Sequence, residues 1–435
     1  MIFERKTDSR LRPRLVLVLA IVVSCAHENA SAQVDFEGPP INYLTAEVRD
    51  PVAKLAEELK SGNRTLWYDP KFGYLPAALE ALEVPIDSQT LVFSKTSLQL
   101  QRISPRHPRA IYFNDDTYVG FCIGGDVLEF ATTDPKQGAM FYTLKQDADG
   151  SPRFIRDQGQ CLSCHATNRT QGVPGFLVRS VFADRAGHPI LGSGTFTSDH
   201  TSPFAERWGG WYVTGNHGSM RHMGNRVYTE EDSIKSDREA GANLESLSPF
   251  IFTTAYLGPH SDIVALMVME HQTQMHNAIA AANYETRHAL YQSFQMNQIL
   301  GREPEHVSES AVRRIDATAA RVLRYLLMCE EYKLEDKISG TSGFAESFSS
   351  KGIKDSKGRS LRDLDLTARL FRYPCSYLIY SQSFDALPDE VRKRVCDGLV
   401  NILEGRDQSP TYAHLTPSMR RDILDILRDT KPEIF

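Results

Sequence analysis

Two cysteines and a histidine are the residues of this chain whose spacing could do chemistry. They occur together as Cys161-Leu162-Ser163-Cys164-His165, a C-x-x-C-H pattern. Two thiols three positions apart on one helical turn can each add to a vinyl group of a haem, and the imidazole that follows reaches the iron from the same turn. Two thioethers and one axial nitrogen would hold the group without a deep pocket.

Three other interpretations of the pattern are weaker. A thioredoxin-like redox pair would need a surrounding strand–helix pattern that this sequence lacks, and it has no use for His165. A zinc ribbon needs a second C-x-x-C pair, and there is none. A disulfide between Cys161 and Cys164 would be strained and easily reduced. The segment therefore resembles c-type cytochromes, over one motif and its flanks and not over the whole chain.

This resemblance implies one covalently attached haem c. Cys161 and Cys164 would be its thioether anchors, and His165 would be the proximal ligand of the iron. We further expect the His165 Nδ1 to donate a hydrogen bond to a backbone carbonyl, which makes the iron-binding nitrogen more basic. The haem propionates need cationic partners, and the sequence offers Arg156 or Arg179 for that role. Solvated surface positions are the alternative for these two and for the other flanking arginines, Arg153 and Arg169.

The second axial ligand is less well specified by the sequence. A Gly-rich segment, 208–225, follows the motif and contains His217, Met220, His222 and Met223. We favour Met223 as the distal ligand, then His222; an ordinary glycine turn with a core methionine is the alternative. Met would raise the reduction potential and His would lower it.

A second group of candidates lies in a long helix expected near 261–300. Glu270, His271, Met275 and His276 cluster there. His271 and Met275 are four positions apart, so they share one face. Either His271 or His276 could line the distal side of a haem. The competing interpretation is an amphipathic helix with core methionines and histidines at its boundary.

Residues 1–32 are predicted to be an export signal. Five basic residues lie within 1–14, an apolar stretch covers 15–23, and Ala30-Ser31-Ala32 gives a small-x-small cleavage site. Val22-Val23-Ser24-Cys25 also resembles a lipobox, so Cys25 could be lipidated and attach the protein to a membrane; we favour the soluble form. Both possibilities place the mature chain in the periplasm or otherwise outside the cytoplasm, where bacterial c-type haem is attached.

The composition is that of a globular protein. The 435 residues are 41% hydrophobic and 24% charged, which excludes a disordered or collagenous chain. The formal net charge is −6, and removal of 1–32 leaves 44 Lys+Arg against 52 Asp+Glu, a net charge of −8. This acidic balance argues against a general nucleic-acid binder. No apolar run reaches about 18 residues, which excludes a multi-span membrane protein.

The patterns predict an α+β fold. A helix is expected at 46–60, and alternating apolar residues with Asn, Asp and Gly turns indicate strands between 89 and 145, with two more at 176–183 and 211–213. Helices are expected at 261–300, 308–333, 388–404 and 416–429, with a long loop at 334–365. We divide the mature chain into a mixed α/β region with the haem motif, 33–250, and a mainly helical region, 251–435. The two are either separate domains or parts of one core.

Four cysteines remain after haem attachment, Cys122, Cys329, Cys375 and Cys396, and they allow three pairings. Cys375 and Cys396 enclose 20 residues, a loop that a disulfide could close. Buried free thiols are the alternative.

The leading functional interpretation is an exported single-haem cytochrome that transfers electrons to or from a redox partner. The motif has about 128 mature residues before it and 270 after it, more protein than a small carrier needs. A haem enzyme, peroxidase-like or another oxidoreductase, is the first alternative. It would leave the sixth position open, with His222, His271 or Glu270 over the iron. A haem-based sensor or binding module is the second.

Overall fold

The computed structural model describes residues 36–230 and 238–435. The predicted signal segment and Cys25 lie outside these residues. Within them, no helix is both long enough and apolar enough to cross a membrane. Residues 33–435 form one compact unit, and one buried hydrophobic cluster runs from Phe36 to Leu427. The regions on either side of residue 250 therefore share a core.

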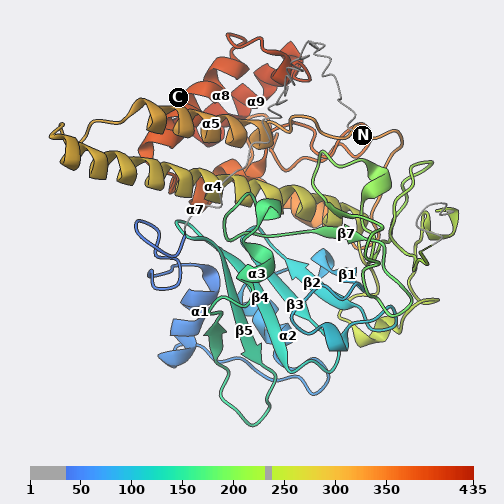
Figure 1. Cartoon of the computed structure of the whole chain (residues 1–435). Helices are drawn as coiled ribbons and strands as arrows, with labels where there is room; N and C mark the ends of the chain where they lie inside the picture. Colours follow the sequence, from blue (N-terminus) through green and yellow to red (C-terminus); the bar gives the residue numbers. More distant parts are fainter. Residues whose placement is uncertain (1–35, 231–237) are drawn as a thin grey trace, which may run out of the picture. The chain divides into compact units, whose positions relative to one another are not determined.

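The first half of the unit is built on a seven-stranded antiparallel sheet, which confirms the expected α+β class (Figure 1). Its order is β6-β5-β4-β3-β2-β1-β9. The strands are β1 (Thr90–Val92), β2 (Arg109–Phe113), β3 (Thr117–Phe121), β4 (Val127–Asp134), β5 (Gly138–Lys145), β6 (Phe154–Arg156) and β9 (Trp211–Tyr212). The β2–β3 turn is closed by Asn114, whose Oδ1 accepts the N–H groups of Asp116 and Thr117 at 3.1 and 2.9 Å.

The two faces of this sheet have different neighbours. On the inner face, Tyr112, Val119, Phe130 and Tyr142 are paired across four strands and all are buried. Helix α1 (Pro51–Lys60) packs on this side. The Asp50 carboxylate that caps its first turn also accepts the Tyr142 hydroxyl at 2.7 Å. Helix α2 (Leu75–Ala81) adds four buried side chains to the same core.

The outer face carries a row of directly paired residues that we call the platform: Ile111, Gly120, Glu129, Thr143 and Ile155. Its members are less buried than the inner row; Ile111, Glu129 and Thr143 are half-buried, and Ile155 is 58% exposed. Ile155 lies on the edge strand β6 and leaves apolar area at this side of the face that another group can cover. Helix α3 (Leu162–His165), which holds the C-x-x-C-H motif, lies beside this face (Figure 1).

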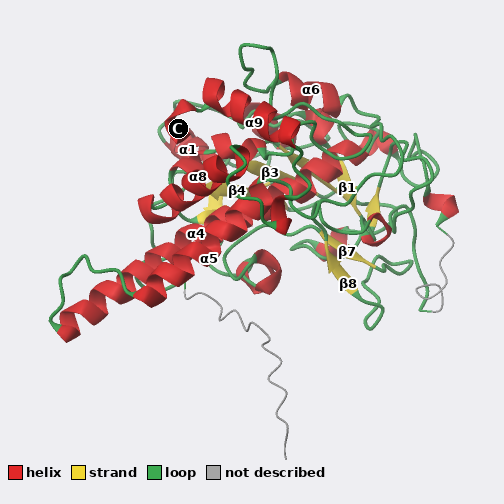
Figure 2. Cartoon of the chain, turned by 90° about the horizontal axis from the view of Figure 1, so that it is seen from above, coloured by secondary structure: helices red, strands yellow, loops and turns green. Residues whose placement is uncertain are grey.

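The second half is helical, as predicted. Helix α4 (Ile263–Leu300) begins at Asp262, which caps Val264 and Ala265, and ends at Gly301 in the left-handed conformation. The other helices are α5 (Glu309–Leu326), α6 (Phe344–Ser350), α7 (Gln382–Asp385), α8 (Asp389–Leu403) and α9 (Pro417–Thr430). Together α4 and α5 form a hairpin whose far end projects from the body (Figures 1 and 2).

Helix α4 is not amphipathic over its first part, which corrects one of our sequence interpretations. Every residue from Ile263 to Tyr284 is buried, because the sheet, the loops after the motif and the C-terminal helices enclose it on all sides. Tyr284 ties it to the sheet by donating to the Gln137 carbonyl at 2.9 Å. Polar residues in this stretch must therefore find partners inside the protein.

Three further expectations need correction. The loop expected at 334–365 contains α6. The strand expected at 176–183 is limited to β7 (Arg179–Val181), which pairs with β8 (Thr195–Thr197) in a separate two-stranded sheet. The Cys375–Cys396 disulfide is absent: both thiols are free, Cys375 fully buried and Cys396 half-buried on α8. Burial accounts for the free Cys375 thiol, which belongs to the hydrophobic core.

Candidate functional site

A single helical turn brings the three motif side chains together. The N–H of His165 donates to the Cys161 carbonyl at 2.9 Å, so Cys161 is the N-cap of α3 and His165 is its last residue. Asp157 holds the start of the turn, because its Oδ2 accepts the N–H groups of Gly159 at 2.8 Å and Cys161 at 3.1 Å. The turn predicted from the spacing is therefore present, and an acidic side chain outside the motif stabilises its first residue.

The His165 ring is oriented by the loop that follows the turn. Its Nδ1 lies 2.9 Å from the Gly175 carbonyl, and the Gly175 N–H donates back to the His165 carbonyl at 2.8 Å. A carbonyl can only accept, so Nδ1 carries the proton and Nε2 holds a free lone pair. The ring also packs on Phe141 of β5, with centroids 4.9 Å apart. Burial lowers the pKa of His165. A neutral imidazole with Nε2 unprotonated is the form that binds a metal.

Asn277 of α4 fixes the loop that orients His165, and no sequence pattern pointed to this residue. Its Oδ1 accepts the Phe176 N–H and its Nδ2 donates to the Phe176 carbonyl, both at 2.8 Å. A Cβ on Gly175 would lie 2.9 Å from the Asn277 Cγ, so this residue must be glycine for the helix to approach so closely. The contact between Asn277 and Phe176 therefore holds Gly175 in the position where its carbonyl meets the His165 ring.

The two motif thiols are free and differ in exposure. Cys161 is half-buried and Cys164 is exposed. Burial, reinforced by Asp157, raises the pKa of the Cys161 thiol to about 12. A dithiol redox pair needs at least one thiol with a lowered pKa, because the thiolate is the nucleophile. The pKa of the Cys161 thiol is shifted in the opposite direction, so Cys161 is a poor nucleophile for such a pair.

Buried polar atoms without partners border the motif. Arg179 of β7 donates from Nη2 to the Thr195 hydroxyl at 3.1 Å, but its Nε is buried and finds no hydrogen-bond acceptor in residues 36–230 and 238–435. Burial also lowers the pKa of Arg179, and Cys164 is among the groups that act on it, which places the guanidinium near the exposed anchor. An unsatisfied guanidinium N–H is suited to a carboxylate such as a haem propionate.

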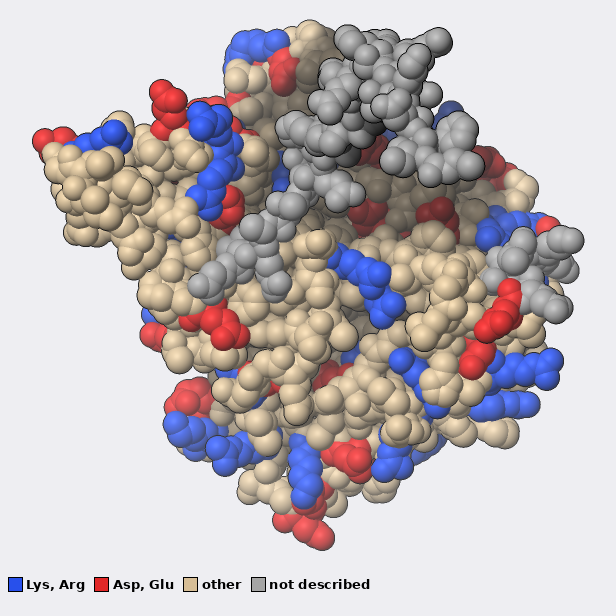
Figure 3. Space-filling model, in the orientation of Figure 1, with Lys and Arg blue, Asp and Glu red and all other residues tan. Residues whose placement is uncertain are grey.

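The other flanking arginines have different roles. Arg156 donates to the Tyr43 and Ala46 carbonyls and so ties the N-terminal segment to β6. Arg153 and Arg169 are exposed. Both arginines that the sequence offers for a propionate have a buried Nε without an acceptor among the described residues. Arg156 already donates from both terminal nitrogens, whereas the hydrogen bond of Arg179 involves Nη2, so Arg179 fits the role better. Figure 3 shows positive and negative side chains interspersed over the face of Figure 1, without a broad patch of either sign.

The Gly-rich segment 208–225 is mostly buried, and its candidate ligands differ in availability. No hydrogen bond or ring contact of the described residues joins His165 to any of them. Met223 is fully buried and its sulfur accepts the Ser180 hydroxyl at 3.7 Å. Both ring nitrogens of His217 have backbone partners. His222 uses Nδ1 to accept the Gly224 N–H at 3.0 Å, whereas its buried Nε2 has no partner.

The distal ligand therefore stays a prediction, and the contacts do not change the order of preference. Because Nδ1 of His222 accepts a hydrogen bond, the neutral ring carries its proton on Nε2 and has no free lone pair there for a metal. The thioether sulfur of Met223 keeps a second lone pair beside the one that accepts the Ser180 hydroxyl, so Met223 stays the first choice.

The α4 candidates belong to a buried polar network. His200 Nε2 lies 3.2 Å from the Cys329 carbonyl, His271 Nδ1 lies 3.3 Å from His200 Nδ1, and His271 Nε2 lies 2.8 Å from the Ser376 hydroxyl. Because the carbonyl only accepts, His200 carries its proton on Nε2, His271 carries its proton on Nδ1, and Ser376 donates. Both nitrogens of His271 are thus occupied in the neutral state.

The remaining α4 candidates are also engaged in the core. Glu270 pairs with Arg207 at 3.2 Å, and both side chains are 3% exposed or less. Burial raises the pKa of Glu270 to about 8 against the opposing effect of Arg207. His276 Nε2 lies 2.7 Å from the Asp115 carbonyl, and Met275 is fully buried. These contacts explain the polar residues of α4 by packing, and none of them points to chemistry on the iron.

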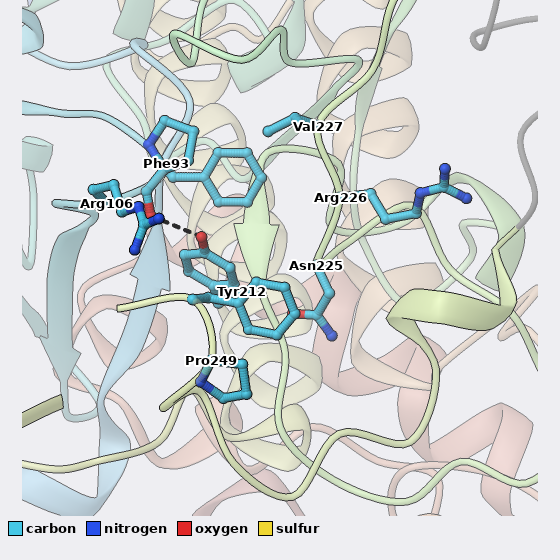
Figure 4. Close-up of a pocket in the computed structure, with 9 residues that line it drawn as sticks. Phe93, Arg106, Tyr212, Asn225, Arg226, Val227 and Pro249 are labelled. Carbon is cyan, nitrogen blue, oxygen red and sulfur yellow. Dashed lines mark hydrogen bonds between the residues drawn. The ribbon is translucent and has the colours of Figure 1, made fainter. Parts of the chain in front are cut away.

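Two cavities of the described chain lie away from the motif. Figure 4 shows a cleft of about 210 Å³ in which the Tyr212 hydroxyl donates to the Pro105 carbonyl and Arg226 extends away from Tyr212. A second cavity, of about 660 Å³, is lined by charged residues of both signs near α1 and α7. Neither includes Cys161, Cys164 or His165. Among the residues that the structure describes, no group of three or more His, Cys, Asp or Glu side chains could hold a bare metal ion.

Comparison with known proteins gave no result: no protein-family model, no curated protein and no solved structure matches this chain. Function must therefore be argued from the site.

Proposed function

We propose that this chain carries one haem c, bound through Cys161 and Cys164 with His165 as the proximal ligand, and that it transfers electrons outside the cytoplasm. The single observation that carries the proposal is the state of His165. Its Nδ1 is tied to the Gly175 carbonyl, and its Nε2 is left with a free lone pair one turn after two free thiols. This is the arrangement that a haem iron requires of a proximal histidine.

The surroundings of the motif fit a flat apolar group with two carboxylates. The platform beside α3 has half-exposed Ile111 and exposed Ile155, which a porphyrin face could cover. Phe141 adds an aromatic contact to His165, and the unsatisfied Arg179 Nε–H offers a partner for one carboxylate. When bound, the haem would supply a one-electron change between the ferric and ferrous states.

The chain's own residues have separate tasks in this proposal. Asp157 keeps the first anchor at the start of the turn. The Gly175 carbonyl keeps the imidazole in one tautomer and one orientation, and Asn277 keeps that carbonyl in place. The half-buried setting of Cys161 limits access of water to one edge of the site. A rigid ligand set of this kind lowers the reorganisation that accompanies electron transfer.

Electron transfer is preferred over a haem enzyme for a specific reason. Two of the side chains considered as acid–base groups, Glu270 and His271, are committed to Arg207, His200 and Ser376 in the core. A peroxidase-like reaction would need one of them, or His222, free beside the iron. A haem-based sensor is the remaining alternative, and it predicts carbon monoxide binding without turnover.

The test is the optical spectrum of the protein matured in a host that assembles c-type haem. We expect covalent haem that survives acid–acetone extraction and a low-spin spectrum, in both redox states, that carbon monoxide does not change. The Cys161→Ser, Cys164→Ser double variant should lose all covalent haem, and Cys396→Ser, which removes a half-buried thiol outside the motif, should retain it. Haem that remains in the double variant after extraction would refute the attachment. A high-spin or carbon-monoxide-sensitive spectrum would favour the enzyme or sensor.

Export is a separate part of the proposal. It depends on residues 1–32, and fractionation of the expressing cells tests it: the mature protein should appear in the periplasmic fraction and begin after Ala32. Recovery in the membrane fraction, lost in a Cys25→Ser variant, would show lipidation instead.

A further inference from the structure

A charged pair lies on the outer face of the sheet beside the motif, and none of the roles given above uses it. Arg109 of β2 and Glu129 of β4 are joined across β3, with Nη2 and Oε2 2.6 Å apart. Their side chains are 18% and 11% exposed, so the pair is largely removed from water. Gln99 donates from Nε2 to the other Glu129 carboxylate oxygen at 3.0 Å and fixes its orientation.

The sheet is built to accommodate this pair. Gly120 of β3 is a member of the platform row and lies directly opposite Glu129 on β4 and Ile111 on β2. A Cβ at position 120 would lie 2.7 Å from the Cζ and Nε of Arg109, so only glycine lets the guanidinium cross β3. A buried ion pair adds little net stability, because desolvation offsets the attraction. Stability alone therefore does not account for the arrangement.

The pair also lies near the motif. Glu129 is paired with Thr143 on β5, and Phe141, two residues earlier on the same face of that strand, packs against the His165 ring with centroids 4.9 Å apart. In addition, the Arg109 Nε is buried and finds no hydrogen-bond partner anywhere in the described chain. An ion pair, an unsatisfied donor and the proximal histidine are thus positioned on one face of the sheet.

This inference rests on the proposed haem. We propose that the Arg109–Glu129 pair forms the charged wall of the haem site on the sheet side and sets the reduction potential of the iron. Oxidation adds one positive charge to the haem. A nearby carboxylate favours the oxidised state and a nearby guanidinium favours the reduced state, and shielding from water keeps both effects strong.

The two charges must act in opposite directions, and this makes the test sharp. In the haem-loaded full chain, Glu129→Gln should raise the midpoint potential and Arg109→Gln should lower it. Arg109→Lys keeps the charge and should return the potential toward the wild-type value. Potentials are measured by optical titration with redox mediators, and the low-spin spectrum of each variant confirms that the ligands are unchanged.

A matched control is available on the opposite face of the sheet. Arg64 and Glu58, at α1, form an Arg–Glu pair at 2.8 Å whose side chains are 45% and 47% exposed. Glu58→Gln and Arg64→Gln should leave the potential unchanged, because water screens this pair.

The outcomes separate the two proposals. Shifts of opposite sign at positions 129 and 109, larger than those of the controls, support the charged wall. Shifts of the same sign, or none beyond the controls, overturn it while leaving the haem proposal intact. If Glu129→Gln fails to fold, Arg109→Gln and Arg109→Lys decide the question by themselves. Absence of covalent haem from the wild-type protein would remove both proposals together.

Discussion

Replacement of Asn277 by alanine is the perturbation that most directly tests how the helical half of the protein supports the motif. The Asn277 side chain makes two buried hydrogen bonds of 2.8 Å to the backbone of Phe176, the residue after Gly175. Alanine leaves one N–H and one C=O of Phe176 without partners. The sequence distance is 101 residues, so no local contact can replace the loss.

The expected magnitude follows from these two groups. Each buried polar group that loses its partner costs about 1–3 kcal/mol. Two such groups give about 2–6 kcal/mol. We expect a value near the lower end, about 3 kcal/mol, because the space left by the amide lets a water molecule enter. That amount is a large fraction of the stability of a typical domain.

Urea unfolding of the purified protein, followed by circular dichroism, measures this change as a lower midpoint at an unchanged slope. Asn283→Ala is the matched control. Asn283 is on the same helix and equally buried, but its bonds to Ala386 and Arg287 are 3.3 Å long and involve only one backbone group. Loss of the Asn283 side-chain hydrogen bonds should lower the free energy of unfolding by about 1 kcal/mol. In haem-loaded protein, only Asn277→Ala should also shift the midpoint potential. Equal costs for the two variants, or a cost below about 0.5 kcal/mol for Asn277→Ala, would refute the reasoning.

Three further predictions concern the buried network and the turn. Burial lowers the pKa of His276 to about 4, below its unfolded value near 6.5, so the stability that it contributes is complete above pH 6.5 and is lost as pH falls toward 4. Between pH 7.5 and 5 this loss is about 2 kcal/mol. Urea unfolding at the two pH values should therefore show that the free energy of unfolding falls by about 2 kcal/mol less in His276→Gln than in the wild-type protein. Because the pKa of Glu270 is about 8, its ion pair with Arg207 is complete only above that pH. Arg207→Met leaves the ionised Glu270 buried and unpaired, so the same assay at about pH 9 should show a cost of about 3–5 kcal/mol; a cost under 1 kcal/mol there would contradict the ion pair. Gly175→Ala overlaps Asn277, so it should cost about 1–3 kcal/mol and weaken the low-spin haem spectrum, whereas Gly172→Ala, with open space around its Cβ but a φ of +80°, should affect stability only.

Local patterns were sufficient for most elements of the fold. Alternating residues with Asn and Gly turns predicted the central strands to within a few residues, because each of those turns is closed by its own side chain or by a left-handed glycine. The long helix was predicted within two residues of its start and at its last residue, since Asp262 and Gly301 cap it. Local signals failed where burial decides: Ile263–Tyr284 is enclosed on all sides, and the free thiol of Cys375 is part of the core.

The sequence by itself determined the motif and the grouping of its three side chains. Cys161, Cys164 and His165 lie within one turn, so their grouping needs no distant contact, and the expected hydrogen bond from His165 Nδ1 to a carbonyl was confirmed. Only the tertiary structure decided which carbonyl accepts the hydrogen bond from His165 Nδ1 and which residues surround the motif. Gly175 is held by Asn277 from α4, and Arg109 reaches Glu129 across β3. Such pairings depend on how the sheet registers and how the helix crosses it, and sequence spacing carries no record of contacts made between elements far apart in the chain.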